Sequence, residues 1–436
     1  MTRRFGRTRA VGLALVAATA ASGTVARAQE PAATFERTVA DLGHKDPHVR
    51  LRAVQALKQA APPEAAIPLT RSLADPDDDI QFQAIAGELN IFLAEKVIPR
   101  KKVGLVVEVR NSISAPSLFD QGPGVFDPRP VPVEVLSALR AAGHDENPRV
   151  SVEALYAFGA LSENAYGPSR RALLLASVPE LVSALGEAEH ADVRGAAIRV
   201  VTRLYSWRMG DGAVDERVGD AVVTALNDQE PQIRLVAMDA LGGLRYDRGV
   251  QALTDTYQHF ERGTVAAAAL GALARIGHVS SLPLFSTALA GRDVPIRVAA
   301  IEGLARAGAM DKQDAINAVL VKENSPDLLL AGHFANVLLA NGAVDELVGG
   351  LARDKLRPRA LRYLLDVAPG RARLLTRHVE DPQPALRIDL LDVLGLSGDP
   401  EAMTIVQRMQ QDADPAVARA ARRAVLRLQG FGATSP

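Results

Sequence analysis

The sequence contains no cysteine, a single tryptophan and only 4% aromatic residues. Without cysteine the chain has no disulfide, no thiolate ligand for a metal and no site for covalent haem attachment, so packing must stabilise it. Beyond the first thirty residues, no apolar run approaches the roughly 18 residues of a membrane span. We therefore expect no membrane insertion once the N-terminal segment has been removed.

An excess of charge of one sign is also lacking. The chain has 50 basic and 51 acidic residues, and loss of residues 1–28, which carry five arginines and no acid, lowers the net charge from −1 to −6. Nucleic acids and anionic lipid surfaces are recognised by clustered basic residues. The composition therefore predicts that neither of them is a partner.

Residues 1–28 have the pattern of a cleavable export signal. Four arginines fall within the first nine residues, an apolar stretch spans 11–21, and Ala26-Arg27-Ala28 supplies the small residues that a signal peptidase accepts. The apolar stretch is too short for a membrane span. We expect cleavage after Ala28 and a bacterial protein that is periplasmic or secreted.

A phrase built on an acid or amide followed by proline recurs along the chain. DPHVRLRAVQAL begins at Asp46, NPRVSVEALYAF at Asn147 and EPQIRLVAMDAL at Glu230. A capping side chain, a proline in the first turn and apolar residues at helical spacing indicate the start of a helix. The apolar residue of this first turn marks eleven units, 28 to 43 residues apart with one step of 70, at Val49, Ile80, Val150, Val193, Ile233, Val265, Ile296, Leu328, Leu356, Leu386 and Val417.

Each unit also has a small residue at a fixed place. Alanine stands four residues after the marker in nine of the eleven units, and a second amphipathic stretch separates successive phrases. Two helices that cannot bury their apolar faces alone must stack on neighbouring units. The pattern predicts an all-α superhelix, a solenoid of about eleven helical hairpins, with repeats 1–2 in 29–97, a long non-helical insertion in 98–131, repeats 3–11 in 132–429 and a tail in 430–436.

The recurring phrase resembles HEAT repeats, in particular the short units of the phycobilisome-lyase type, over residues 33–429. The resemblance implies the solenoid fold, and together with the signal-like residues 1–28 it implies an exported bacterial member of this family. It implies no single activity, because such repeats occur in scaffolds, adaptors and a few enzymes. One unit departs from the pattern, with Gly332 and Asn336 where alanine and leucine are expected after Leu328.

Arginine directly follows the marker in six units, from Arg50 to Arg387. Such a column suits either anion binding or ion pairs with the capping acid of the same or the next unit. We favour the second alternative, which predicts a structural ladder along the solenoid.

The residues six positions after each marker are predicted to point outward from the second helix of each unit, the helix that lines the concave surface of such solenoids. Their charges alternate in sign, which suits a protein or peptide partner better than a nucleic acid. The candidate contacts are Tyr156, Arg199, Asp239, Glu302, Arg362 and Asp392, together with Tyr205 and Trp207 at the end of the fourth unit.

The 70-residue step leaves an insertion rich in proline and glycine, with strand-like sequence from Lys101. Loops of this length are usually functional or disordered, and Phe119 and Phe126 need a surface to cover. Either the insertion folds back over the solenoid groove, or it binds a partner through Phe119, Phe126 and Arg129. The first alternative is favoured, because the segment contains no histidine or cysteine that could carry chemistry.

Motifs for chemistry are missing. None of the eight histidines precedes a glutamate, and neither a G-x-S-x-G nor an S-x-x-K motif occurs. We therefore expect no catalytic residue, no metal and no cofactor, and we predict an exported protein-binding scaffold or adaptor rather than an enzyme. The alternatives are an enzyme or small-ligand-binding protein with a site beside 98–131, and a structural subunit of an envelope complex.

Overall fold

The computed structural model describes residues 30–95, 114–206, 214–260, 262–321 and 323–432. These residues are helical apart from short connections, and one isolated antiparallel bridge joins Leu93 to Phe126. The predicted signal in 1–28, the strand-like stretch from Lys101 and the candidate contact Trp207 lie outside the described residues.

The helices in this part of the chain form eleven consecutive pairs, which confirms the predicted all-α solenoid. The first helix of a pair is short or broken in several units, and it is replaced by 3-10 turns in the tenth. Those that are continuous are α1 (Glu30–Asp41), α6 (Val133–Ala142), α8 (Gly167–Gly186), α10 (Glu216–Thr224), α12 (Val250–Phe260), α14 (Leu282–Leu289), α16 (Gln313–Leu320), α18 (Asp345–Leu351) and α21 (Pro400–Met409).

The second helix is continuous in every pair. These helices are α2 (Pro47–Ala60), α4 (Asp78–Phe92), α7 (Pro148–Ser162), α9 (Ala191–Leu204), α11 (Pro231–Leu244), α13 (Thr264–Ile276), α15 (Val294–Arg306), α17 (Pro326–Ala340), α19 (Arg357–Val367), α20 (Pro384–Gly395) and α22 (Pro415–Gly432).

The second helices begin where the recurring phrase predicts. Asp46, Asn147 and Asp293 each accept a hydrogen bond from a backbone N–H of the first turn, and a proline lies in that turn. The alanine four residues after the marker is buried, as at Ala197 and Ala300. Side chains this small let consecutive second helices approach each other closely, so α11 packs on α13 and α13 packs on α15.

The arginine column forms a ladder as predicted, but its partners are not the predicted capping acids. Arg50 donates hydrogen bonds of 2.7 and 2.8 Å to Asp75, an acid that stands two residues before the N-cap of the next unit. The same guanidinium donates to the carbonyls of His44 and Lys45 in front of its own helix. An arginine with this pair of contacts ties two neighbouring units together, whereas Arg234 donates to the carbonyls of Asp228 and Gln229 in front of its own helix. Equivalent ion pairs join Arg194 to Asp228, Arg297 to Glu323 and Arg387 to Asp412.

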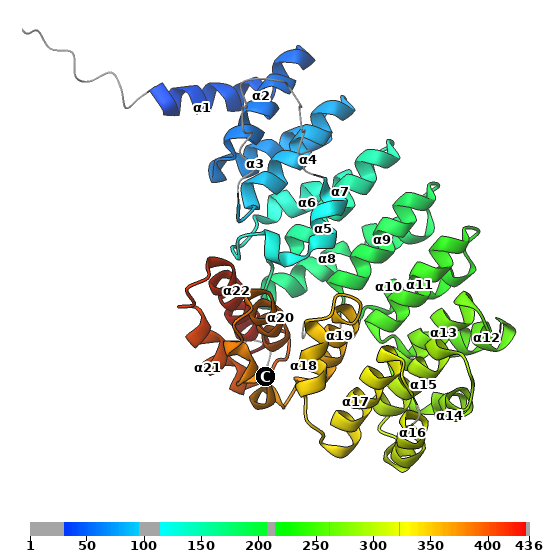
Figure 1. The fold of residues 1–436 in the computed structure, drawn as a ribbon. Coiled ribbons are helices and arrows are strands. Elements are labelled where there is room, and N and C mark those ends of the chain that lie inside the picture. The colour runs from blue at the N-terminus through cyan, green and yellow to red at the C-terminus, as the bar shows by residue number, and fades with distance from the viewer. Residues whose placement is uncertain (1–29, 96–113, 207–213, 261, 322, 433–436) are drawn as a thin grey trace, which may run out of the picture.

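The solenoid closes into a ring (Figure 1). Its last helix, α22, packs against α8 and against the 3-10 turn η3 (Pro123–Val125), so the end of the chain returns to the insertion and the fourth unit. Arg423 of α22 donates to the carbonyl of Pro123 at 3.4 Å, and Arg419 lies 3.5 Å from Glu95. Units 3 to 11 therefore form the ring, and units 1 and 2, whose helices are α1, α2, the short α3 (Ala66–Leu69) and α4, extend from it.

The eighth unit keeps the register of the others despite its unusual sequence. Gly332 takes the place of the alanine because Leu320 of α16 packs directly against it, and a Cβ at this position would overlap the Leu320 side chain. Asn336 accepts a hydrogen bond from Gln313, also on the neighbouring segment. The unusual residues Gly332 and Asn336 therefore change the local side-chain packing, while helix α17 stays continuous.

Part of the insertion is helical, which corrects the prediction of a wholly non-helical segment. Helix α5 (Ala115–Gln121) begins with a proline in its first turn and ends at Gly122, whose φ of 81° is favourable only for glycine. The surrounding prolines and glycines hide this helix of seven residues in the sequence pattern, because they dominate the composition of the segment.

Candidate binding site on the inner surface of the ring

The second helices line the inner surface of the ring (Figure 1). Asp366 of α19 accepts a hydrogen bond of 2.6 Å from Arg245 at the end of α11 and one of 2.8 Å from Arg306 of α15. These arginines are separated from Asp366 by 121 and 60 residues of sequence, so distant units meet here. The inner surface is therefore partly filled, and its open parts determine what it can bind.

Helix α5 covers the inner surface at α7 and α9. Phe119 is 3% exposed, and its ring centroid lies 5.0 Å from that of Tyr156. The Arg203 guanidinium lies 3.7 Å over the Phe119 ring and donates to the Phe119 carbonyl. Arg199 pairs with Asp120 and donates to the Tyr156 hydroxyl at 3.1 Å. The prediction that Phe119 and Tyr156 contact a partner is therefore corrected, because both side chains are buried within the chain.

The remaining residues predicted to contact a partner from the insertion also pack within the chain. Phe126 is 2% exposed and pairs with Leu93 through backbone atoms. Arg129 lies 4.7 Å over the ring of Phe92 and donates to the carbonyl of Ile91. Both hold residues 114–131 against the end of α4. Of the two alternatives for the insertion, its described part thus follows the one in which it folds back over the solenoid.

Two other predicted contacts are engaged inside the ring, which corrects their assignment to a partner surface. Tyr205 is buried and donates a hydrogen bond of 2.7 Å to the carbonyl of Leu174. Asp392 accepts hydrogen bonds from Arg423 at 3.1 Å and Arg427 at 3.0 Å. Burial raises the pKa of Asp392, but the two guanidinium groups outweigh it and hold this pKa below its ordinary value.

Glu302 is buried at the middle of the inner surface, so its role as an exposed contact is corrected as well. It accepts hydrogen bonds from the Tyr363 hydroxyl at 2.6 Å and from Arg306 at 3.0 Å. Burial raises the pKa of Glu302, whereas Arg306 and the hydrogen bond from Tyr363 lower it, and the net pKa lies below its ordinary value. Tyr363 stacks on Phe334, with 4.2 Å between the ring centroids.

Two adjoining hollows remain open between α11, α13, α15 and α19. The first has a volume of about 210 Å³, and we call it the Gly271 hollow; its lining includes Ala267, Ala268, Gly271, Arg275, Ala299, Glu302, Arg359 and Arg362. The second measures about 180 Å³, and we call it the Arg245 hollow; it is lined by Asp239, Gly242, Gly243, Arg245, Arg275, Arg306, Arg362 and Asp366. Of the predicted contacts, Asp239, Glu302 and Arg362 meet here.

Arg362 lines both hollows, and it makes no hydrogen bond or ion pair with any other residue that the structure describes. Burial lowers the pKa of its guanidinium, and the charge of Glu302 raises that pKa only in part. Space is available beside it, because a Cβ added to Gly271 would meet no atom within 4 Å. The open part of the inner surface thus borders an unpaired, partly buried cation.

The sequence analysis missed a second arginine column that supplies much of this surface. It lies ten residues after the marker in four units, at Arg203, Arg275, Arg306 and Arg427. These side chains bind the insertion, Asp239, Asp366 and Asp392, respectively. The constant spacing was a usable signal, but it does not show that these side chains face other units and the insertion rather than solvent.

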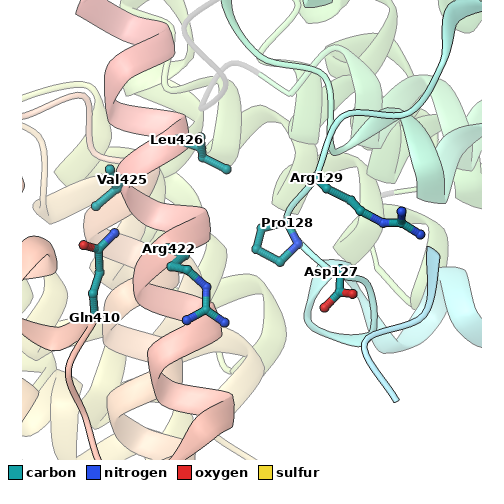
Figure 2. A pocket seen from close by; sticks show the side chains of 7 residues that line it. All are labelled: Asp127, Pro128, Arg129, Gln410, Arg422, Val425 and Leu426. Carbon is teal, nitrogen blue, oxygen red and sulfur yellow. The ribbon is translucent and has the colours of Figure 1, made fainter. Parts of the chain in front are cut away.

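A third hollow lies where the ring closes, between the insertion and α22 (Figure 2). It measures about 420 Å³ and is lined on one side by Asp127, Pro128 and Arg129 and on the other by Gln410, Arg422, Val425 and Leu426. This is the place that the alternative of a small-ligand site beside the insertion requires.

Within the described ranges, no group of three or more histidine or acidic side chains could hold a metal ion. No helix in those ranges is long and apolar enough to cross a membrane. The expected absence of a metal and of a cofactor stays a prediction.

Comparison with known proteins agrees with the fold. Residues 178–274 and 219–305 match the family model described as HEAT repeats, and no curated protein matches the sequence. The helix pairs before and after this stretch repeat the same packing. Residues 178–305 therefore match HEAT repeats, and the described helix pairs on both sides continue the same solenoid.

Three similar solved structures have low identity and low TM-scores. An engineered protein shares 15% identity over 91% of this chain and 98% of its own, with a TM-score of 0.40. The complex of CpcE and CpcF of phycocyanin lyase from Nostoc sp. shares 18% over 58% of this chain and 94% of that chain (TM-score 0.37). Human deoxyhypusine hydroxylase in complex with glycerol shares 14% over 60% and 99%, respectively (TM-score 0.29).

Proposed function

We propose that this protein is an exported scaffold that binds a protein or peptide on the inner surface of its ring. Helical-repeat solenoids use such surfaces for extended binding partners. The observation that carries the proposal is the pair of adjoining hollows, which leave Asp239, Gly271 and Arg362 accessible, whereas α5 covers the inner surface at α7 and α9. The signal-like residues 1–28 support export.

A capture experiment tests this function. The full chain would be expressed with an affinity tag in an envelope-containing host, and co-purified proteins would be compared with those of Asp239→Lys. We expect specific partners to be lost, because Asp239 is 70% exposed at the Arg245 hollow and reversal changes the charge there. Glu401→Lys, at a 45% exposed acid of α21, is the matched control. If both variants retain every partner, the inner surface is not the binding site.

The export part of the proposal has its own test. N-terminal sequencing of the protein recovered from the cell envelope should begin at Gln29. A protein that is recovered only from the cytoplasm, with residues 1–28 intact, contradicts it.

A second candidate function is a small-ligand or enzymatic site at the hollow of Figure 2, which the size of about 420 Å³ favours. Asp127 and Arg422 are the charged groups available there. Metal analysis and a hydrolase substrate panel on the purified protein, with Asp127→Asn as the comparison, would detect it. Turnover that disappears with this substitution would place the active site in the hollow between the insertion and α22.

A further inference from the structure

The inner surface holds five arginines around the Gly271 and Arg245 hollows, and four of them are matched by acids. Arg275 binds Asp239 at 2.6 Å, and Arg359 pairs with Asp327. Arg306 and Arg245 share Asp366, and Arg306 also binds Glu302. The four acids leave a surplus of one positive charge.

That surplus is carried by Arg362, the arginine that pairs with no described residue. It stands between both hollows, with Glu302 as the acid that influences it most and with the cations Arg275 and Arg359 nearby. A guanidinium that has lost part of its hydration and gained no hydrogen bond is costly, so an arriving anion would recover that cost. The site lacks one negative charge.

We propose that Arg362 binds a single carboxylate of the peptide or protein partner, seated in the Gly271 hollow. The inference rests on the proposed scaffold function and specifies the chemistry that its inner surface recognises. A planar guanidinium presents paired N–H donors that match the two oxygens of a carboxylate.

The size and charge of the site both favour a carboxylate. Liquid water occupies about 30 Å³ per molecule, so a hollow of about 210 Å³ holds several waters or one side-chain-sized group. It is smaller than the pockets of about 300–1,000 Å³ that enclose whole cofactors or nucleotides. One surplus charge matches one carboxylate, whereas a phosphate dianion would bring excess negative charge next to Glu302.

Gly271 keeps the hollow open. It lies in the interior of α13, where alanine would be more favourable for the helix, and nothing within 4 Å would obstruct a side chain. Packing therefore does not explain the glycine, but access to Arg362 does. A larger side chain at this position would occupy the space of the ligand without displacing any residue of the protein.

Isothermal titration of the full chain with three blocked hexapeptides tests the proposal. Acetylated and amidated hexaglutamate offers side-chain carboxylates, acetyl-hexaglycine offers only its C-terminal carboxylate, and acetylated and amidated hexaglycine offers none. We expect one or both of the first two to bind and the third not to bind. Which of these two peptides binds shows whether the carboxylate comes from a side chain or from a chain terminus.

Two variants locate the binding without relying on contacts that stabilise the fold. Arg362→Gln and Gly271→Leu should each weaken the peptide affinity at least tenfold, because the first removes the unpaired cation and the second fills the hollow. Arg408→Gln, at a 56% exposed arginine of α21, is the matched control and should bind as the unaltered chain does. Circular dichroism should show all three variants to be folded.

Three results would overturn the proposal. The first is that neither carboxylate peptide binds, and the second is that Arg362→Gln and Gly271→Leu bind the peptide as tightly as the unaltered chain does. The third is that inorganic phosphate binds at the same site more tightly than the peptides do. Peptide binding combined with a failed capture experiment would refute the scaffold function and leave the carboxylate site standing. Successful capture that depends on Asp239, combined with no peptide binding, would retain the scaffold and remove the carboxylate assignment.

Discussion

The packing of the last helix, α22, on α20 can be tested at Asp392, the acid of α20 that two arginines of α22 share. The side chains of Arg423 and Arg427 are only 2% and 4% exposed, and Asp392 is their carboxylate partner at 3.1 and 3.0 Å. In Asp392→Asn both guanidinium groups stay buried without a matching charge. Removing one member of a buried ion pair costs about 3–5 kcal/mol. We therefore expect the packing of α22 on α20 to weaken by at least about 3 kcal/mol.

Hydrogen exchange followed by mass spectrometry measures this loss locally. A cost of about 3 kcal/mol raises the open population of residues 384–432 about 150-fold, while exchange in 148–306 stays unchanged. The matched control is Asp239→Asn, which removes a 70% exposed acid from Arg275 and should cost about 0–1 kcal/mol, as exposed ion pairs do. Equal protection of α22 in Asp392→Asn and the unaltered chain, or an equally large effect of Asp239→Asn, would refute the reasoning.

Three further predictions concern the fold. Burial raises the pKa of Glu88 well above 4.5, and neither of its carboxylate oxygens has a hydrogen-bond partner in the described residues. The free energy of unfolding should therefore fall by about 1.4 kcal/mol for each unit by which the pH rises from 4.5 towards the folded-state pKa. Urea unfolding of Glu88→Gln should lack this pH dependence. Gly271→Ala should stabilise the protein by about 0.5–1 kcal/mol in thermal unfolding, whereas Gly242→Ala, which meets Arg275 and the Ala272 backbone, should destabilise it. Phe119→Ala should cost about 3–5 kcal/mol and expose α5 to proteolysis; unchanged resistance to cleavage would show that α5 is held by other contacts.

Much of the fold could be predicted from the sequence because each repeat is specified locally. The capping acid at Asp46, the proline after it and the buried alanine at Ala53 act within one or two turns, and the ladder from Arg50 reaches only the next unit. Interactions over such short separations leave a period in the sequence. The six-residue offset likewise identified Asp239 and Arg362 as residues of the inner surface.

The ring closure could not be predicted, because its contacts leave no period. Arg423 and Pro123 are 300 residues apart, and Arg245 and Asp366 are 121 apart. The sequence spacing does not indicate that the two members of each pair lie in contact. Their contact depends on small rotations between units, added over many units. Tyr156 and Asp392 were predicted to be exposed for a different reason: the six-residue offset does not show that Arg199 and Arg423 of the next unit reach back over them.

Closure also restricts how such a chain can evolve. An open array gains or loses a unit of about 31 residues at little cost, since each unit contacts only its neighbours. In the ring, an added unit between 133 and 432 would shift α22 away from α8 and η3 and expose both surfaces. Duplications should therefore be tolerated before α5, among α1 to α4, and removed by selection elsewhere. The repeat number of the ring is in this sense a fixed property of the protein, as subunit number is in a cyclic oligomer.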